Sequence, residues 1–137
     1  MKRTNSRIMA MIVLYNYEIT NEINIKSIEE MIDDNDFAYD KDFTSALIKG
    51  ILENTEEIDY IISTNLENYT IDRLSYIDRN LIRIGVFEMM KTDTPKNIII
   101  NEIIEISKIF TEISGYQTSK FNNALLDKIA QRIYDGK

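Results

Sequence analysis

Apolar side chains recur every three or four positions along most of this chain, which is the spacing of one face of an α-helix. The clearest example lies near the end of the sequence, where Phe121, Leu125, Ile129 and Ile133 follow one another at intervals of four. One proline and four glycines in 137 residues leave few positions that oppose helix formation. The pattern predicts an all-α protein.

We expect about seven helical segments, and several begin at a typical capping residue. Thr4, Asp40 and Thr70 can each cap a helix through a side-chain oxygen. Thr94-Pro95 is a typical helix start, because the missing N–H of proline needs no partner at the first helical position. The expected segments are residues 4–19, 26–34, 41–66, 71–74 (a short turn), 76–91, 95–113 and 119–134.

Two of these segments need comment. Residues 41–66 form one long expected helix with Gly50 in its middle, which costs about 1 kcal/mol relative to alanine and predicts a close helix contact. Residues 97–106 are rich in isoleucine and could form a strand. Their apolar pattern continues beyond a typical strand of about 5–6 residues, and no other segment offers a strand partner, so we expect a helix.

The composition indicates a single globular domain spanning residues 1–137. Apolar residues make up 44% and charged residues 28%, an ordinary mixture for a folded chain. No apolar run approaches the roughly 20 residues that cross a bilayer. The short apolar run at 8–15 lacks a small-residue cleavage site, so we expect no signal peptide and a cytoplasmic protein without a membrane partner.

The chain contains neither cysteine nor histidine. This excludes disulfides, thiol catalysis, Ser-His-Asp chemistry and nearly every zinc site. The acidic cluster at 33–36 could suggest calcium, but Ala38 and Tyr39 stand where a calcium loop needs a ligand and a glycine. We therefore expect no metal and no cofactor. An enzyme would have to work with carboxylates, lysine, tyrosine or serine alone, and we expect no enzymatic activity.

The net charge of −7 is unevenly distributed. Residues 18–60 carry 13 acids and 3 bases, whereas the first 17 residues carry Lys2, Arg3 and Arg7 and no acid. Residues 1–7 thus form a basic N-terminal arm that would attract an RNA phosphate, because charges more than about 8–10 Å away are screened at physiological salt. A solvated basic tail is the alternative interpretation.

Four stretches follow one another in an order and spacing typical of one family. They are Arg7-Ile8-Met9-Ala10-Met11-Ile12-Val13-Leu14-Tyr15; Phe43 to Gly50 with Asn54 and Ile58-Asp59; Ile77-Asp78-Arg79-Asn80-Leu81-Ile82-Arg83-Ile84 with Glu88, Pro95 and Ile100-Asn101-Glu102; and Glu105, Lys108 and Phe110 with Lys120-Phe121 and Asn123-Ala124-Leu125-Leu126-Asp127. Over nearly its whole length the chain resembles the NusB family of transcription antitermination factors.

The resemblance implies a fold of two small three-helix bundles packed together. It also implies binding to the boxA element of ribosomal RNA leader transcripts, as a heterodimer with a small-subunit ribosomal protein (NusE). The complex would join other Nus factors on RNA polymerase and suppress termination. The chain departs from the family at Ile12, Asn122 and Ala124, where glutamine, valine or isoleucine, and glycine are usual.

Five residues are the candidates for RNA contact. Lys2, Arg3 and Arg7 can reach phosphates from a mobile arm, and Lys120 and Asn123 open the last helix, where N–H groups and a lysine can hold a phosphate. Phe121 beside them is more typical of a core position at this spacing, but it could stack on a base if exposed.

Four residues are the candidates for partner contact, namely Tyr15, Asp78, Arg79 and Arg83. Arg79 and Arg83 are four apart and share a helix face, which suits phosphate or an acidic partner surface. The alternative for the two arginines is pairing within the chain, for example with Glu102 or Glu105. The alternative for Tyr15 is packing in the core. Glu88, Asn101 and Glu102 are expected to be structural.

Two functional hypotheses remain at this stage. The leading one is a binding module for RNA together with a ribosomal protein, in which the acidic block at 18–60 faces a basic partner or keeps the protein in solution. The other is a helical protein–protein adaptor that retains the fold without RNA binding. The sequence leaves the oligomeric state open, including a homodimer that would cover the RNA face.

Overall fold

The computed structural model describes residues 2–31, 37–111 and 118–135, and these residues form helices and connecting loops without strands. The all-α prediction is therefore confirmed. The elements are α1 (Lys2–Thr20), α2 (Ile25–Met31), α3 (Lys41–Glu53), α4 (Thr55–Asn65), the short 3-10 helix η1 (Ile71–Arg73), α5 (Tyr76–Lys91), α6 (Lys96–Thr111) and α7 (Ser119–Asp135).

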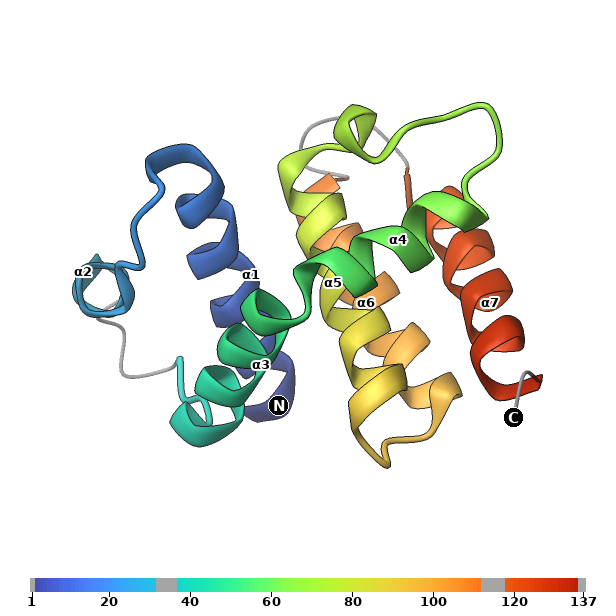
Figure 1. Ribbon diagram of the computed structural model, residues 1–137. Coiled ribbons are helices and arrows are strands. Elements are labelled where there is room, and N and C mark those ends of the chain that lie inside the picture. The colour runs from blue at the N-terminus through green and yellow to red at the C-terminus, as the bar shows by residue number, and fades with distance from the viewer. Residues whose placement is uncertain (1, 32–36, 112–117, 136–137) are drawn as a thin grey trace.

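The helices form two packed groups (Figure 1). Helices α1, α2 and α3 lie together, and α5, α6 and α7 form the second bundle, with α4 running from the end of α3 across α5 to α7. Helix α5 packs against both groups and is buried on nearly all sides, because apolar residues such as Leu81, Ile84 and Val86 occur around its whole circumference. The expected pair of bundles is confirmed, with α5 as their shared wall.

The single long helix expected at 41–66 is wrong, because it breaks at Asn54 into α3 and α4. The Asn54 side-chain amide donates to the carbonyl oxygen of Gly50 at 2.7 Å, and the Thr55 hydroxyl donates to that of Ile51 at 2.8 Å. These side chains share the carbonyl oxygens of the last turn with the Asn54 backbone N–H, which donates to both Gly50 and Ile51 at 3.1 Å. The break redirects α4 toward α7.

The close contact expected at Gly50 is confirmed. A Cβ atom added at this position would lie 2.2 Å from Cζ of Phe87 on α5. The aromatic ring therefore occupies the space that any larger side chain would need. This contact brings α3 directly against the central helix.

Replacing Gly50 by alanine should lower the free energy of unfolding by about 1–3 kcal/mol through overpacking, although alanine is the better helix former. Urea denaturation measures the change. A second substitution, Phe87→Leu in the Gly50→Ala background, should restore part of the loss because it removes the clashing ring atoms. A Gly50→Ala protein more stable than the parent would contradict the close contact.

The helix starts agree with the sequence in part. Asp40 caps α3 as expected, since its Oδ1 accepts from the Phe43 N–H at 3.1 Å. Thr4 is not a cap, because α1 already begins at Lys2 and the Thr4 hydroxyl donates to Glu102 at 2.6 Å. Thr70 makes no side-chain capping bond at η1. The isoleucine-rich segment is helical, and the Ile99 N–H donates to the Pro95 carbonyl oxygen at 3.1 Å.

Parts of some expectations lie outside the described residues. The acidic cluster at 33–36 and the expected ends of helices 26–34 and 95–113 fall there. Within the described ranges, no group of acidic side chains is arranged to hold a metal ion. None of the described helices is both long and apolar enough to cross a membrane.

Candidate RNA and partner interface

The basic N-terminal residues belong to the first turns of α1 rather than to a free arm. Lys2 and Arg3 remain exposed on this end of the helix. The Arg3 guanidinium carbon lies 3.9 Å from the centre of the Phe43 ring, and Arg3 also approaches Asp40 at 3.9 Å. Both cations can reach a phosphate from an ordered surface.

Arg7 needs a correction, because it is buried with 3% of its surface exposed. Its Nε and Nη2 atoms donate to the two carboxylate oxygens of Glu88 at 2.7 and 2.8 Å, and Nη1 donates to Glu102 at 3.0 Å. Burial would lower the pKa of Arg7, but the charges and hydrogen bonds of Glu88 and Glu102 outweigh it and hold the pKa above its ordinary value. Arg7 joins α1 to α5 and α6 and is not free to contact RNA.

A second charged cluster joins the other end of α1 to α5. The Glu18 carboxylate accepts from Arg79 at 2.6 Å, from Arg83 at 2.7 Å and from Asn80 at 2.8 Å. Arg83 also donates to both oxygens of Asp59, at 2.8 and 2.9 Å. The two arginines therefore pair within the chain, as the alternative interpretation expected. Their acidic partners lie on α1 and α4, however, and not on α6. Sequence reasoning did not single out Glu18, because partners so far apart in the chain leave no local pattern.

Asp78 is also turned inward, with 3% of its surface exposed. It accepts hydrogen bonds from the Thr118 hydroxyl at 2.8 Å, from the Asn122 amide at 3.0 Å and from the Ser107 hydroxyl at 3.4 Å. Asn122 is fully buried, so its departure from the family's usual apolar residue supplies a donor to a buried carboxylate. Asp78 therefore ties α5 to α6 and α7 and does not face a partner.

Two exposed aromatic pairs lie on either side of η1. Tyr15 packs edge-on against Tyr76 with ring centres 5.8 Å apart, and Tyr69 lies 5.6 Å from Phe121. All four rings are between 36% and 44% exposed. Arginine side chains cover two of them: Arg79 lies over Tyr76 at 4.7 Å, and Arg73 lies over Tyr69 at 5.6 Å. We call this surface the aromatic end; it comprises Tyr15, Tyr69, Tyr76, Phe121, Arg73 and Arg79.

Phe121 is thus an exposed ring and not the core residue that its spacing favours. Tyr69 and Tyr76 were missed at the sequence level. Tyrosines on both sides of the expected turn at 71–74 could have indicated an exposed aromatic surface. Tyrosines are, however, equally typical of helix ends that pack against the rest of the protein.

The structure divides the five RNA candidates between opposite ends of α5. Helix α1 runs antiparallel to α5, since its start contacts Glu88 and its end contacts Arg79 (Figure 1). Lys120 and Asn123 are exposed at the start of α7, whose Asn122 contacts Asp78. Asp78 and Glu88 are about 15 Å apart along the helix axis. Lys120 and Asn123 therefore lie toward the aromatic end, and Lys2 and Arg3 lie at the far end.

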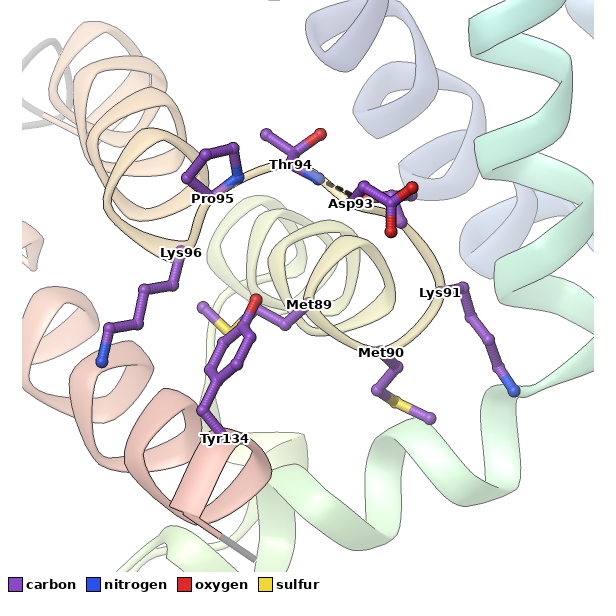
Figure 2. A pocket seen from close by; sticks show the side chains of 9 residues that line it. Met89, Met90, Lys91, Asp93, Thr94, Pro95, Lys96 and Tyr134 are labelled. Atoms are coloured by element: carbon purple, nitrogen blue, oxygen red, sulfur yellow. Dashed lines mark hydrogen bonds between the residues drawn. The ribbon is translucent and has the colours of Figure 1, made fainter. Parts of the chain in front are cut away.

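A cavity of about 550 Å³ opens where the loop between α5 and α6 meets Tyr134 of α7. Figure 2 shows Lys91 and Lys96 extending away from each other around Met89 and Met90, while Asp93 points to another side. A small-molecule site normally brings a few polar groups together on its ligand. These side chains do not converge, and we assign no ligand to the cavity.

Comparison with known proteins connects this architecture to one family. The model of the NusB family matches residues 4–131. The transcription antitermination protein NusB of Listeria monocytogenes serotype 4a (strain HCC23) is 38% identical over 132 residues, which cover 95% of this chain and 97% of the relative.

Two solved structures agree with this match. A crystal structure of T. maritima NusB superimposes with a TM-score of 0.77 and 34% identity, covering 96% of this chain and 92% of that one. The second is a crystal structure of the antitermination factors NusB and NusE in complex with dsRNA. It aligns with a TM-score of 0.73 and 29% identity over 93% of this chain and 95% of the other. The curated relative is a transcription antitermination protein and not an enzyme, in agreement with our expectation. The chain belongs to the NusB family.

Proposed function

We propose that this protein is a transcription antitermination factor that binds boxA-type RNA of ribosomal RNA leaders as a heterodimer with the small-subunit ribosomal protein NusE. It would then join other Nus factors on RNA polymerase, which places its work in the cytoplasm. The similarity to a NusB that was solved together with NusE and dsRNA supports the RNA and the ribosomal partner. We propose the association with RNA polymerase and the preference for boxA from the resemblance to the NusB family.

The aromatic end is the observation that carries the RNA proposal. Single-stranded RNA is recognised by stacking its bases on aromatic rings and arginine planes, and its phosphates are held by lysine and arginine. Phe121 and Tyr69 provide exposed rings, and Lys120 and Asn123 lie beside Phe121 in the chain at the start of α7. We place the primary RNA contacts on these four residues.

Lys2 and Arg3 would serve a longer RNA. They lie about 20 Å from Tyr15 along α1, so a strand must extend well beyond the aromatic end to meet them. Their contribution should be electrostatic and strongly dependent on salt, because both are exposed cations. Arg7 would support this region only by holding α1 on α5.

For the partner surface, Tyr15 and Tyr76 provide an exposed aromatic patch, and the buried Arg79 supports it by lying over the Tyr76 ring at 4.7 Å. Aromatic residues and arginine are enriched at protein interfaces. Glu53, Glu56 and Glu57 are exposed where α3 ends and α4 begins, and their negative charge suits a basic ribosomal protein. Arg83 would act behind this patch, because it holds Glu18 and Asp59.

Fluorescence anisotropy of a labelled boxA-like RNA, with and without NusE, tests the proposal. We expect weak binding alone and at least roughly tenfold tighter binding with the partner, since the joint surface adds a second set of contacts. Phe121→Ala should cost about 1–3 kcal/mol of RNA binding through lost stacking. Tyr60→Ala is the matched control, because Tyr60 is 70% exposed on α4 and lies outside the aromatic end.

The adaptor hypothesis makes the opposite prediction. If NusE binds but RNA affinity does not rise, and if Phe121→Ala behaves like Tyr60→Ala, the RNA role must be abandoned for this chain. Sedimentation of the free protein should accompany the titration, because a homodimer that covers the aromatic end would weaken RNA binding in a concentration-dependent way.

A further inference from the structure

The start of α7 is bound at two points to one buried carboxylate on α5. The Thr118 hydroxyl donates to Oδ2 of Asp78 at 2.8 Å, and the Asn122 amide donates to Oδ1 of Asp78 at 3.0 Å. Thr118 directly precedes α7, and the backbone N–H of Asn122 donates to its carbonyl oxygen at 2.9 Å. The two anchors are therefore one helical turn apart.

Asn122 also binds the third helix of the bundle. Its Nδ2 donates to the Ser107 hydroxyl of α6 at 3.1 Å, and this hydroxyl donates to Asp78 at 3.4 Å. Hydrogen bonds are directional, whereas the attraction between apolar side chains is not. An amide at this position consequently fixes the rotation of α7 about its own axis more narrowly than an apolar residue would.

Stability of the core does not by itself favour asparagine at this position. Asn122 is fully buried, and its Oδ1 has no hydrogen-bond partner within the described part of the chain. A buried acceptor without a partner destabilises a folded protein. The apolar residue that is usual in the family would avoid this cost, but it would offer no donor to Asp78.

Phe121 is the neighbour of Asn122, and the rotation of α7 decides where its ring lies. Successive side chains of a helix point about 100° apart, so Phe121 faces outward when Asn122 faces the core. The Phe121 ring is 42% exposed, and its centre lies 5.6 Å from that of the Tyr69 ring. A rotation of α7 would change the distance between these two rings.

We propose that Asn122 is a positioning residue for RNA binding, because its hydrogen bonds to Asp78 and Ser107 hold α7 in the rotation that places Phe121 against Tyr69. The inference rests on the proposed function and deepens it by naming a core residue that acts through Phe121 without touching RNA. With an apolar residue at this position, only the Thr118 anchor on Asp78 would remain, and α7 could turn about that point.

Asn122→Val tests the inference, since an apolar residue of this kind is usual in the family and should leave the protein folded. NMR of the free parent protein should show nuclear Overhauser effects between the rings of Phe121 and Tyr69, and these should be weaker in the variant. RNA binding in the presence of NusE should weaken by roughly 3- to 10-fold, which is part of the effect of losing a stacked base. NusE binding should stay unchanged, because Asn122 lies in the core.

Exchanging the two side chains provides the rescue. Asn122→Asp alone would place two carboxylates together in the core, and it should destabilise the protein and weaken RNA binding. In combination with Asp78→Asn, the new amide at position 78 can donate to the new carboxylate at position 122, and the Ser107 hydroxyl is within reach of both positions. The double variant should therefore recover the ring contact and the RNA affinity.

Ile129→Val is the matched control for a general loss of stability. Ile129 is fully buried further along α7, so its truncation loosens the core without touching the start of the helix. It should lower the melting temperature and leave the ring contact and the RNA affinity unchanged. If Ile129→Val weakened RNA binding as much as Asn122→Val, the effect would be one of stability, and the inference would be wrong.

The measurements separate the inference from the proposed function. If RNA binds together with NusE but Asn122→Val changes neither the ring contact nor the RNA affinity, the inference fails alone. It also fails if the double variant is folded but does not recover the affinity. If Asn122→Val disturbs the ring contact but the parent protein shows no partner-dependent RNA binding, the proposed function fails, and the part of the inference that concerns RNA fails with it.

Discussion

Replacing Glu88 by alanine should destabilise the protein by about 3–5 kcal/mol, the largest effect that we expect for a single substitution. Glu88 is fully buried and holds the buried guanidinium of Arg7 with two hydrogen bonds. Without it, Arg7 keeps the partly exposed Glu102 as a charged partner and remains otherwise desolvated. Urea or thermal denaturation monitored by circular dichroism measures the loss.

Glu105→Ala is the matched control on the neighbouring helix. Its side chain is 67% exposed and pairs with Lys108, so the change should lie within about 0.5 kcal/mol of zero. If Glu88→Ala lowered the free energy of unfolding as little as Glu105→Ala, Arg7 would have to leave its buried position at little cost. Arg7 could then reach the surface and contact RNA. Arg7→Ala should in turn lower stability by a similar amount, because Glu88 would then be a buried carboxylate without a cation.

The second large effect is expected for Glu18→Ala, which should lower the free energy of unfolding by about 2–3 kcal/mol and also weaken NusE binding. Glu18 is the shared acceptor for Arg79, Asn80 and Arg83. Its removal leaves the nearly buried Arg79 without its charged partner and loosens the end of α1 that carries Tyr15. Calorimetric titration with NusE and urea denaturation measure the two effects.

Two further variants separate the structural from the functional part of this result. Glu18→Gln keeps the shape and one acceptor oxygen and should recover part of both losses. Glu22→Ala removes an exposed acid just beyond α1 and should change neither. If Glu18→Ala lowered stability but left NusE affinity intact, the partner would bind elsewhere than on the surface formed by Tyr15 and Tyr76.

The sites were harder to predict than the helices. Lys2, Arg3, Lys120 and Asn123 are exposed, as a role in RNA binding requires, because charged and amide side chains usually remain in water. Arg7, Asp78 and Arg79 are buried because acids or donors from distant segments meet them. The sequence offers no sign of such pairing, since any acid in the chain is a candidate partner.

The sequence by itself determined the helical class, the position of most helices and the membership of one family. Helical periodicity and caps such as Asp40 act within a few residues, so they can be recognised without knowing the rest of the fold. The break at Asn54 is accompanied by hydrogen bonds from two short polar side chains to the preceding turn, each worth only about 1 kcal/mol, and such bonds leave no mark on the apolar pattern.

The tertiary structure alone decided which charged residues are available to a partner. Arg7 meets Glu88 across 81 residues of chain, and Phe121 reaches the surface beside Tyr69 because α4 crosses over to α7. Such contacts depend on how helices pack, and packing is determined by the combined shape of many side chains rather than by any one segment.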